Sequence, residues 1–396
     1  MAENTDGSYF RVDKVAPLDT AKLDYTPKPW HKPRKQWVRE VQWRGSIEPL
    51  LSDINLTDRP LGYLSFPGED FLDIRDLHEL AERSNFNIRF LGFNSEKSTK
   101  TNLSYSEVLD LPRIAADSDF IKDEFETVAD KESLGHERIC VAPGYDVVNL
   151  DFCKSVASYD AGTRQSAFDA ILHLIEQQTR NRTEPWLLFI TCRSNHETVR
   201  ESVRKKFARV FVDNCANVQE FEDFTSKAFE LNAATVQSVL DSSKTKAEEI
   251  LDRAQDFHFF GVGLTKWLIS LAHNDWNIRP TKVAGYRVNY SHDICDMHSI
   301  VYRFDRIQRT ITDRTGITPV RNTAATPNEG EIALAAVPML KEYTDLDVLL
   351  HRDPDKRKSF NKKNAQLMAQ ARYDQAQTLS WGAGVGWTPD SVKQNG

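Results

Sequence analysis

The chain has 396 residues, of which 40% are hydrophobic and 10% aromatic, and its net charge is −7. This composition excludes a largely disordered protein, and the length permits one large domain with additions or two domains. No apolar run approaches the roughly 20 residues that a membrane helix needs, and the start of the chain, MAENTDGSYF, lacks the features of a secretory signal. We therefore expect a cytoplasmic protein with no membrane contact.

Residues 1–57 are predicted to form a polar arm followed by a basic, aromatic segment. Residues 28–44 carry a net charge of +5 and interleave three tryptophans with their Lys and Arg residues. Cations beside aromatic rings suit the phosphates and bases of a nucleic acid. Four side chains of this segment are the predicted nucleic-acid contacts: Arg34, Lys35, Trp37 and Arg39. The alternative is an amphipathic edge helix that buries Trp37, Val38 and Val41 while its charges face water.

Residues 58–310 alternate between strand-like and helix-like runs. Strands are expected at 61–66, 87–93, 145–152, 185–192, 281–291 and 297–306. Helices are expected at 73–83, 119–130, 162–180, 218–256 and 263–275. Strand–helix repeats closed by a late strand pair predict an α/β fold with a mostly parallel, doubly wound sheet.

After this region the composition changes twice. Residues 311–332 are rich in Thr, Pro, Asn and Gly, which predicts a linker. Residues 333–396 are predicted to form a helical, basic tail, in which 352–372 carry a net charge of +5. Basic segments at both ends of an acidic body suggest contact with a polyanion at particular places, although for the tail a solvated charge run is the favoured explanation.

The order of elements, together with "NLDF" at residues 149–152, resembles the class I S-adenosylmethionine-dependent methyltransferases, as an uncharacterised, divergent branch. The resemblance covers residues 58–305 and implies a Rossmann-like sheet with a terminal antiparallel strand. It also implies that S-adenosylmethionine binds where the first two strands end. The matching cofactor positions are Phe66, Gly68 and Glu69 after the first strand, and Asn94 and Glu96 after the second.

The end of the fourth strand supplies the catalytic candidates, which are Asn149, Asp151 and Phe152. Methyltransferases that act on exocyclic amines of bases often carry (D/N)PP(Y/F) here, and the resemblance implies the same two roles. Asp151 would accept a hydrogen bond from the amine, while the ring of Phe152 would stack on the base. The alternative is a strand-end Asp that caps the next helix and a Phe that belongs to the core.

No metal site is predicted. The five cysteines have no paired spacing, and neither CxxC nor HxxxH occurs. Residues 293–298 contain four side chains that can bind a metal ion: Asp293, Cys295, Asp296 and His298. So short a connecting loop rarely directs four ligands at one ion. No GxxxxGK[ST] is present, so a nucleotide-hydrolysing phosphate loop is excluded.

The sequence therefore predicts a methyltransferase acting on a nucleic-acid base amine. The rival hypothesis is a catalytically inactive methyltransferase-like scaffold that binds nucleic acid or protein partners in a processing or defence complex. The single glycine of the first turn favours the scaffold, because cofactor-binding turns need backbone that approaches the ligand closely. A nuclease would need a cluster of acids and a lysine, for which Glu96-Lys97 alone is weak.

Overall fold

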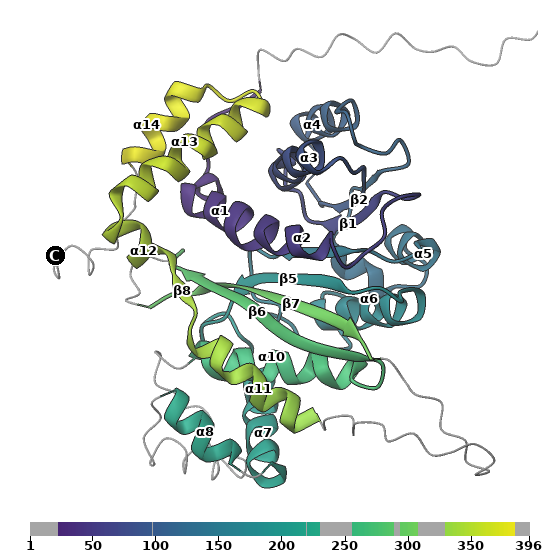
Figure 1. Cartoon of the computed structure of the whole chain (residues 1–396), viewed down its shortest axis with the longest axis vertical. Helices are drawn as coiled ribbons and strands as arrows, with labels where there is room; N and C mark the ends of the chain where they lie inside the picture. The colour runs from purple at the N-terminus through teal and green to yellow at the C-terminus, as the bar shows by residue number, and fades with distance from the viewer. Residues whose placement is uncertain are drawn as a thin grey trace, which may run out of the picture.

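The computed structural model describes residues 23–96, 98–218, 220–229, 256–288, 294–307 and 329–384. Its strands are β1 (Leu61–Ser65), β2 (Ile88–Phe93), β3 (Asp119–Ile121), β4 (Val147–Asp151), β5 (Trp186–Arg193), β6 (Trp276–Tyr286), β7 (Met297–Arg306) and β8 (Thr344–Asp345). They form one sheet in the order β3-β2-β1-β4-β5-β7-β6-β8 (Figure 1). β7 runs antiparallel to β5 and β6, and the other adjacent pairs are parallel. The predicted α/β fold with a mostly parallel sheet is confirmed.

Helices cover both faces of this sheet. The first helical turns are η2 (Pro29–His31), α1 (Pro33–Trp37), the π-helical η3 (Val38–Arg44) and α2 (Gly45–Leu50). The central helices are α3 (Leu72–Ser84), α4 (Thr99–Leu109), η4 (Phe125–Ala129), α5 (Leu134–Val141), α6 (Ala167–Asn181), α7 (Glu201–Asn217), α8 (Phe221–Ala228) and α10 (Asp256–Ala272). The last are α11 (Glu329–Lys341), α12 (Leu346–Arg352), α13 (Pro354–Gln370) and α14 (Gln375–Gly384).

The alternation of side chains along each strand divides the core into two layers. Tyr63 and Leu187 point to the layer covered by η3, α2 and α3, whereas their neighbours Leu64 and Leu188 point to the layer covered by α6, α7 and α10. Successive side chains of a strand face opposite sides, so a strand that is apolar at every position must be covered on both faces. Figure 1 shows α1 and α2 on one side of β5, β7 and β6, with α10 and α11 on the other.

Two predicted details of the helices are wrong. The segment 119–130 is not one helix: Phe120 pairs with Gly92 in the parallel ladder, and only η4 is helical. Pairing with the neighbouring strand β2 therefore overrides the local helical spacing. The spacing of Phe168, Ile171, Leu172 and Ile175 in the helix expected at 162–180 predicts one buried stripe. In α6 three of these side chains are buried, but that of Leu172 is 45% exposed.

The two terminal segments pack on the same face of the sheet. Gln42 of η3 donates a hydrogen bond of 2.6 Å to the carbonyl oxygen of Ser299 in β7, and the ring of Trp43 stacks over Phe189 in β5. Asn364 of α13 donates to the carbonyl oxygen of His31 at 2.8 Å. The first and last helical segments that the structure describes thus contact one another.

Several predicted segments lie partly outside the described residues. These are the arm up to residue 22, most of the helix expected at 218–256, the end of the strand expected at 281–291, the linker expected at 311–332 and the tail after residue 384. Residues 329–332 of the expected linker belong to α11 instead. In the part of the chain that the structure describes, no helix has both the length and the apolar character needed to cross a membrane.

Candidate functional site

A pocket of about 470 Å³ opens at the carboxyl ends of β1, β2 and β4. These three strands are adjacent and parallel, so their carboxyl ends lie on one edge of the sheet, where open α/β sheets bind ligands. Nine of the predicted site residues line it: Lys35, Arg39, Phe66, Gly68, Glu69, Asn94, Glu96, Asp151 and Phe152. The topology brings together side chains that are separated by more than 100 residues in the sequence.

The turn after β1 shapes one wall of the pocket. Gly68 has a φ of +63°, a conformation that L side chains rarely adopt, and a Cβ atom added there would meet no atom within 4 Å. The missing side chain therefore leaves open space on the pocket side of the turn. Phe71 also takes a left-handed conformation, with a φ of 53°, and begins α3 directly afterwards.

The loop after β2 contributes acceptors at the rim. The side-chain oxygen of Asn94 accepts a hydrogen bond from the backbone N–H of Glu96 at 2.9 Å, which fixes the turn. Partial desolvation and the nearby carboxylate of Glu69 raise the pKa of Glu96. Two carboxylates that share a rim in this way favour a ligand with a positive charge or with hydroxyl donors.

Asp151, at the end of β4, forms an ion pair with the segment that precedes β1. The Nζ atom of Lys35 lies 2.5 Å from Oδ1 of Asp151 and 4.9 Å from the centre of the Trp43 ring. Burial by itself lowers the pKa of Lys35, but the charges of Asp151 and Tyr286 and the hydrogen bond to Asp151 outweigh it, so the pKa is raised. The side chain of Asp151 is still 25% exposed, so it retains access to the pocket.

The other two catalytic candidates lie in more enclosed positions. Asn149 is buried and does not line the pocket; its amide donates to the hydroxyl of Tyr63 at 2.9 Å, and Tyr63 donates to Asp73 at 3.0 Å. Phe152 lines the pocket with a 6% exposed ring whose centre lies 5.0 Å from that of Phe66. Phe152 thus belongs to the aromatic wall of the pocket as well as to the core.

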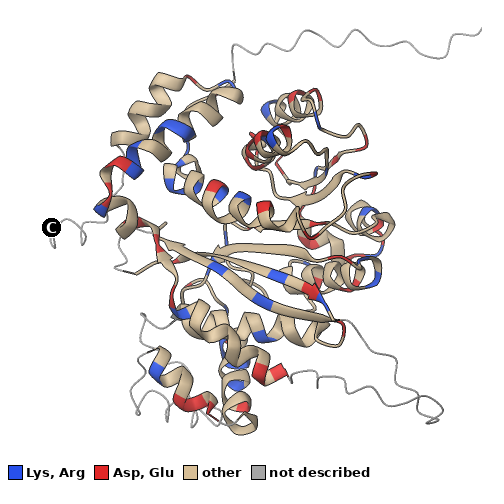
Figure 2. Ribbon diagram, viewed as in Figure 1, with Lys and Arg blue, Asp and Glu red and all other residues tan. Residues whose placement is uncertain are grey.

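The predicted nucleic-acid contacts are not presented on an open surface. Arg34 is buried in an ion pair with Asp347, and Lys35 is held by Asp151. Trp37 packs beside the core layer under η3. Figure 2 shows α1 and η3 between the sheet and α13. The edge-helix alternative placed the charges in water and buried Val41, but Arg34, Lys35 and Arg39 are buried and Val41 is 36% exposed.

Arg39 is buried and lines the pocket. Its Nη1 atom donates a long hydrogen bond of 3.5 Å to Gln36, and its Nε atom has no hydrogen-bond partner among the described residues. A guanidinium at the wall of a pocket is suited to bind an anionic group of a ligand.

A buried polar network beneath the first turn was missed at the sequence level. Asp70 lies 3.0 Å from Nε2 of His31 and 2.9 Å from Nζ of Lys100, and it accepts a hydrogen bond of 2.9 Å from Tyr373. Burial alone raises the pKa of Asp70, but His31 and Lys100 lower it below its ordinary value. The three partners of Asp70 come from distant segments of the chain, so no local motif predicts them.

The possible metal ligands at residues 293–298 do not gather around one point in the described part of this segment. Asp293 lies outside the described residues. Asp296 pairs with Arg193, and the ring of His298 stacks on Phe257 with centres 3.7 Å apart. Asp296 and His298 are therefore engaged in structural contacts.

The Lys35–Asp151 pair predicts an asymmetric effect on stability. We expect Asp151→Asn to be more destabilising than Lys35→Met. Asp151→Asn leaves the buried ammonium of Lys35 without its anion, whereas Lys35→Met leaves a carboxylate that still contacts water. A double-mutant cycle from urea unfolding should give a coupling free energy of about 1–3 kcal/mol. The exposed pair Arg83–Glu48 is the control, with a coupling below about 1 kcal/mol. Equal coupling in both pairs would contradict the burial argument.

Comparisons with known proteins give the following matches. No curated protein sequence matches the chain significantly. Among solved structures, it is similar to the O-methyltransferase domain StiE O-MT residues 942–1257, at 12% identity and a TM-score of 0.31, over 80% of this chain and 87% of that chain. A family model, PP_RS20740-like, matches residues 24–383. By this match over most of its length, the chain belongs to the PP_RS20740-like family.

Proposed function

We propose that the protein binds S-adenosylmethionine in the pocket at the ends of β1, β2 and β4 and transfers its methyl group to an amine. The observation that carries this proposal is the convergence, in a methyltransferase-like sheet, of three strand-end segments on one cavity of about 470 Å³. This volume lies within the range of about 300–1,000 Å³ that small-molecule sites occupy.

The polar groups of the pocket match the charges of this cofactor. The carboxylates of Glu69 and Glu96 and the amide of Asn94 would accept hydrogen bonds from the ribose hydroxyls and the amino group. The guanidinium of Arg39, which lines the pocket, would bind the cofactor carboxylate. The rings of Phe66 and Phe152 offer an aromatic surface to the adenine or to the positively charged sulfonium.

The proposed transfer needs positioning more than acid–base chemistry. When bound, the cofactor would supply an electrophilic methyl group for attack by the nitrogen lone pair of the substrate, and the electron pair of the broken carbon–sulfur bond would remain on its sulfur. The amine then loses a proton to solvent. Asp151 would orient the amine through the carboxylate oxygen that Lys35 does not hold, and Asn149 would support this strand end from behind.

For the substrate we propose an exocyclic amine of a nucleic-acid base, in a protein that works in the cytoplasm. With Arg34, Lys35 and Arg39 buried, the phosphate contacts would come from the exposed lysines of α13, which belong to the second basic segment. These are Lys356, Lys358, Lys362 and Lys363.

One observation favours the scaffold as a second candidate. Asp151 is already paired with Lys35 and the ring of Phe152 is mostly buried, so both residues make structural contacts in the absence of any ligand. A protein that keeps the sheet but has lost the cofactor would retain these contacts for stability alone.

Cofactor binding separates the two candidates. Calorimetry on the purified protein should detect one S-adenosylmethionine per chain. Gly68→Ala should weaken the binding by about tenfold to a hundredfold, because the added methyl group enters the space that the ligand needs. Protein incubated with methyl-labelled cofactor and RNA or DNA should then yield an N-methylated base.

The matched control for this variant is Gly162→Ala. Gly162 also has a positive φ, +82°, and open space around the missing Cβ, but it does not line the pocket. Both variants suffer similar backbone strain, so only occlusion of the pocket distinguishes them. Absence of binding by the unmodified protein at millimolar cofactor would favour the scaffold, and an equal loss in both variants would point to strain.

A further inference from the structure

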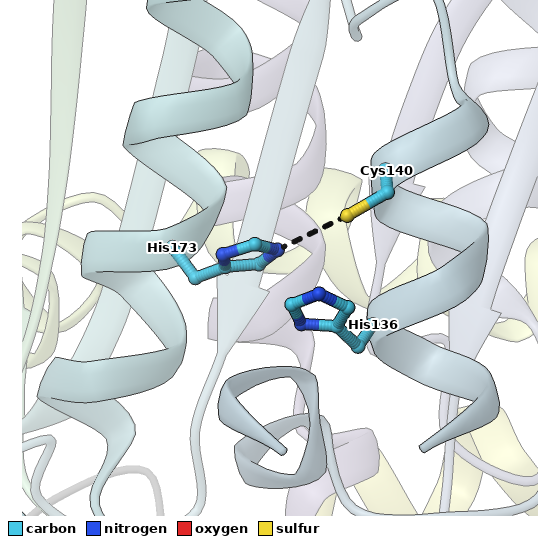
Figure 3. A group of neighbouring side chains, drawn as sticks. All are labelled: His136, Cys140 and His173. Carbon is cyan, nitrogen blue, oxygen red and sulfur yellow. Dashed lines mark hydrogen bonds between the residues drawn. The ribbon is translucent and has the colours of Figure 1, made fainter. Parts of the chain in front are cut away.

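A second cluster of chemically active side chains lies between α5 and α6, on the helical layer away from the pocket. His136 and Cys140 are four residues apart on α5, so they share one face of the helix. His173 of α6 faces them, as Figure 3 shows. One ligand atom from each of the three residues can be chosen such that all lie within 4.8 Å of one another.

The distances suit a tetrahedral metal ion. Zinc binds thiolate sulfur at about 2.3 Å and imidazole nitrogen at about 2.0–2.1 Å, so two such ligands at a tetrahedral angle are separated by about 3.6 Å. The Sγ atom of Cys140 lies 3.6 Å from Nε2 of His173. The rings of His136 and His173 are stacked, with centres 4.1 Å apart and an angle of 19° between their planes, so the ring of His173 must rotate about its side-chain bonds before both nitrogens point at one ion.

The second nitrogen of His136 is already fixed. Its Nδ1 atom lies 3.0 Å from the carbonyl oxygen of Val128, which can only accept, so Nδ1 carries the proton and Nε2 keeps its lone pair for a metal. Metal-binding histidines commonly donate their other N–H to such a carbonyl, which sets the tautomer and the direction of the ring.

We propose that His136, Cys140 and His173 bind a zinc-type divalent ion, with solvent as the fourth ligand. Two imidazoles and one thiolate are ligands that Zn²⁺ prefers, and hard ions such as Mg²⁺ and Ca²⁺ bind oxygen instead. The Cys140 side chain is exposed, so the ion can enter and a water molecule can complete the tetrahedron. This site is independent of the proposed methyl transfer.

The ion would fasten one wall of the pocket. Val128 belongs to η4, and the same turn contributes Phe125 and Glu126 to the pocket lining. Through His136 and His173, the ion would join α5 and η4 to α6, which is anchored to the sheet by its buried face. Its role would be to hold the pocket wall in place, and no chemistry at the cofactor is required of it.

The test uses the untagged, full-length protein after removal of metal with a chelator. Titration with Zn²⁺ should show one ion per chain and a rise in melting temperature by mass action. Addition of Co²⁺ instead should give the absorption of a tetrahedral ion with a thiolate-to-metal band. Cys140→Ser and His173→Gln should each lower the Zn²⁺ affinity by at least about 100-fold, since loss of a ligand costs more than loss of its supporting hydrogen bond.

Matched variants use the same residue types elsewhere in the chain. Cys153→Ser removes another exposed thiol, and His351→Gln removes a partly buried histidine of α12; both should bind Zn²⁺ as the unmodified protein does. A simple thiol–imidazole hydrogen bond predicts no stoichiometric Zn²⁺ binding at all. That result, a Co²⁺ spectrum without the thiolate band, or equal affinity in all four variants would overturn the proposal. If a variant does not fold, the Co²⁺ spectrum of the unmodified protein still tests the proposed metal site.

Discussion

Asp146→Ala is expected to lower the free energy of unfolding by about 3–5 kcal/mol, the scale for removing one partner of a buried charge cluster. Asp146 is 0% exposed and precedes β4 at the edge of the sheet opposite the pocket. It accepts hydrogen bonds from Arg59 at 2.6 and 2.9 Å and from the backbone N–H of Gly62 at 2.7 Å, and it lies 2.8 Å from Arg182. Its removal leaves the buried Arg182 without this carboxylate.

Urea unfolding measures this loss. Asp117→Ala is the control, because Asp117 pairs with Arg89 on the surface and is 66% exposed, so its loss should stay within about 1 kcal/mol. Similar losses in the two variants would mean that the cluster around Asp146 is as weak as a surface ion pair.

Phe152→Ala is expected to cost about 3–4 kcal/mol as a truncation in the core and to weaken cofactor binding as well. The ring packs at its edge against Phe66, with centres 5.0 Å apart, and against Phe125, at 6.5 Å. All three rings line the pocket, so a cavity at Phe152 allows the aromatic wall to shift. Urea unfolding gives the stability, and calorimetry with S-adenosylmethionine gives the binding.

Phe304→Ala separates the two effects. Phe304 is fully buried and stacks on Trp186 with ring centres 3.9 Å apart, away from the pocket. Its truncation should cost a similar free energy of unfolding and leave the affinity for the cofactor unchanged. If both variants bind the cofactor equally well, Phe152 has a packing role only.

Some of the fold follows from local pattern. The apolar runs at 61–66, 87–93, 145–152 and 185–192 became β1, β2, β4 and β5, because each is short, apolar on both faces and separated by a helical stretch. Once these strands are parallel, their carboxyl ends must share an edge. The residues after each strand were therefore predictable neighbours from the sequence, and those after β1, β2 and β4 line one pocket.

The sequence by itself thus determined the sheet, its parallel core and the strand ends that surround the pocket. Only the tertiary structure decided which side chains pair across it. Lys35 meets Asp151 over 116 positions, Tyr373 meets Asp70 over 303, and Cys140 meets His173 over 33. Such pairs depend on how helices pack against the sheet, to within the length of a side chain. A strand or helix repeat along the chain carries no information at that scale, because it fixes only which face of an element is buried.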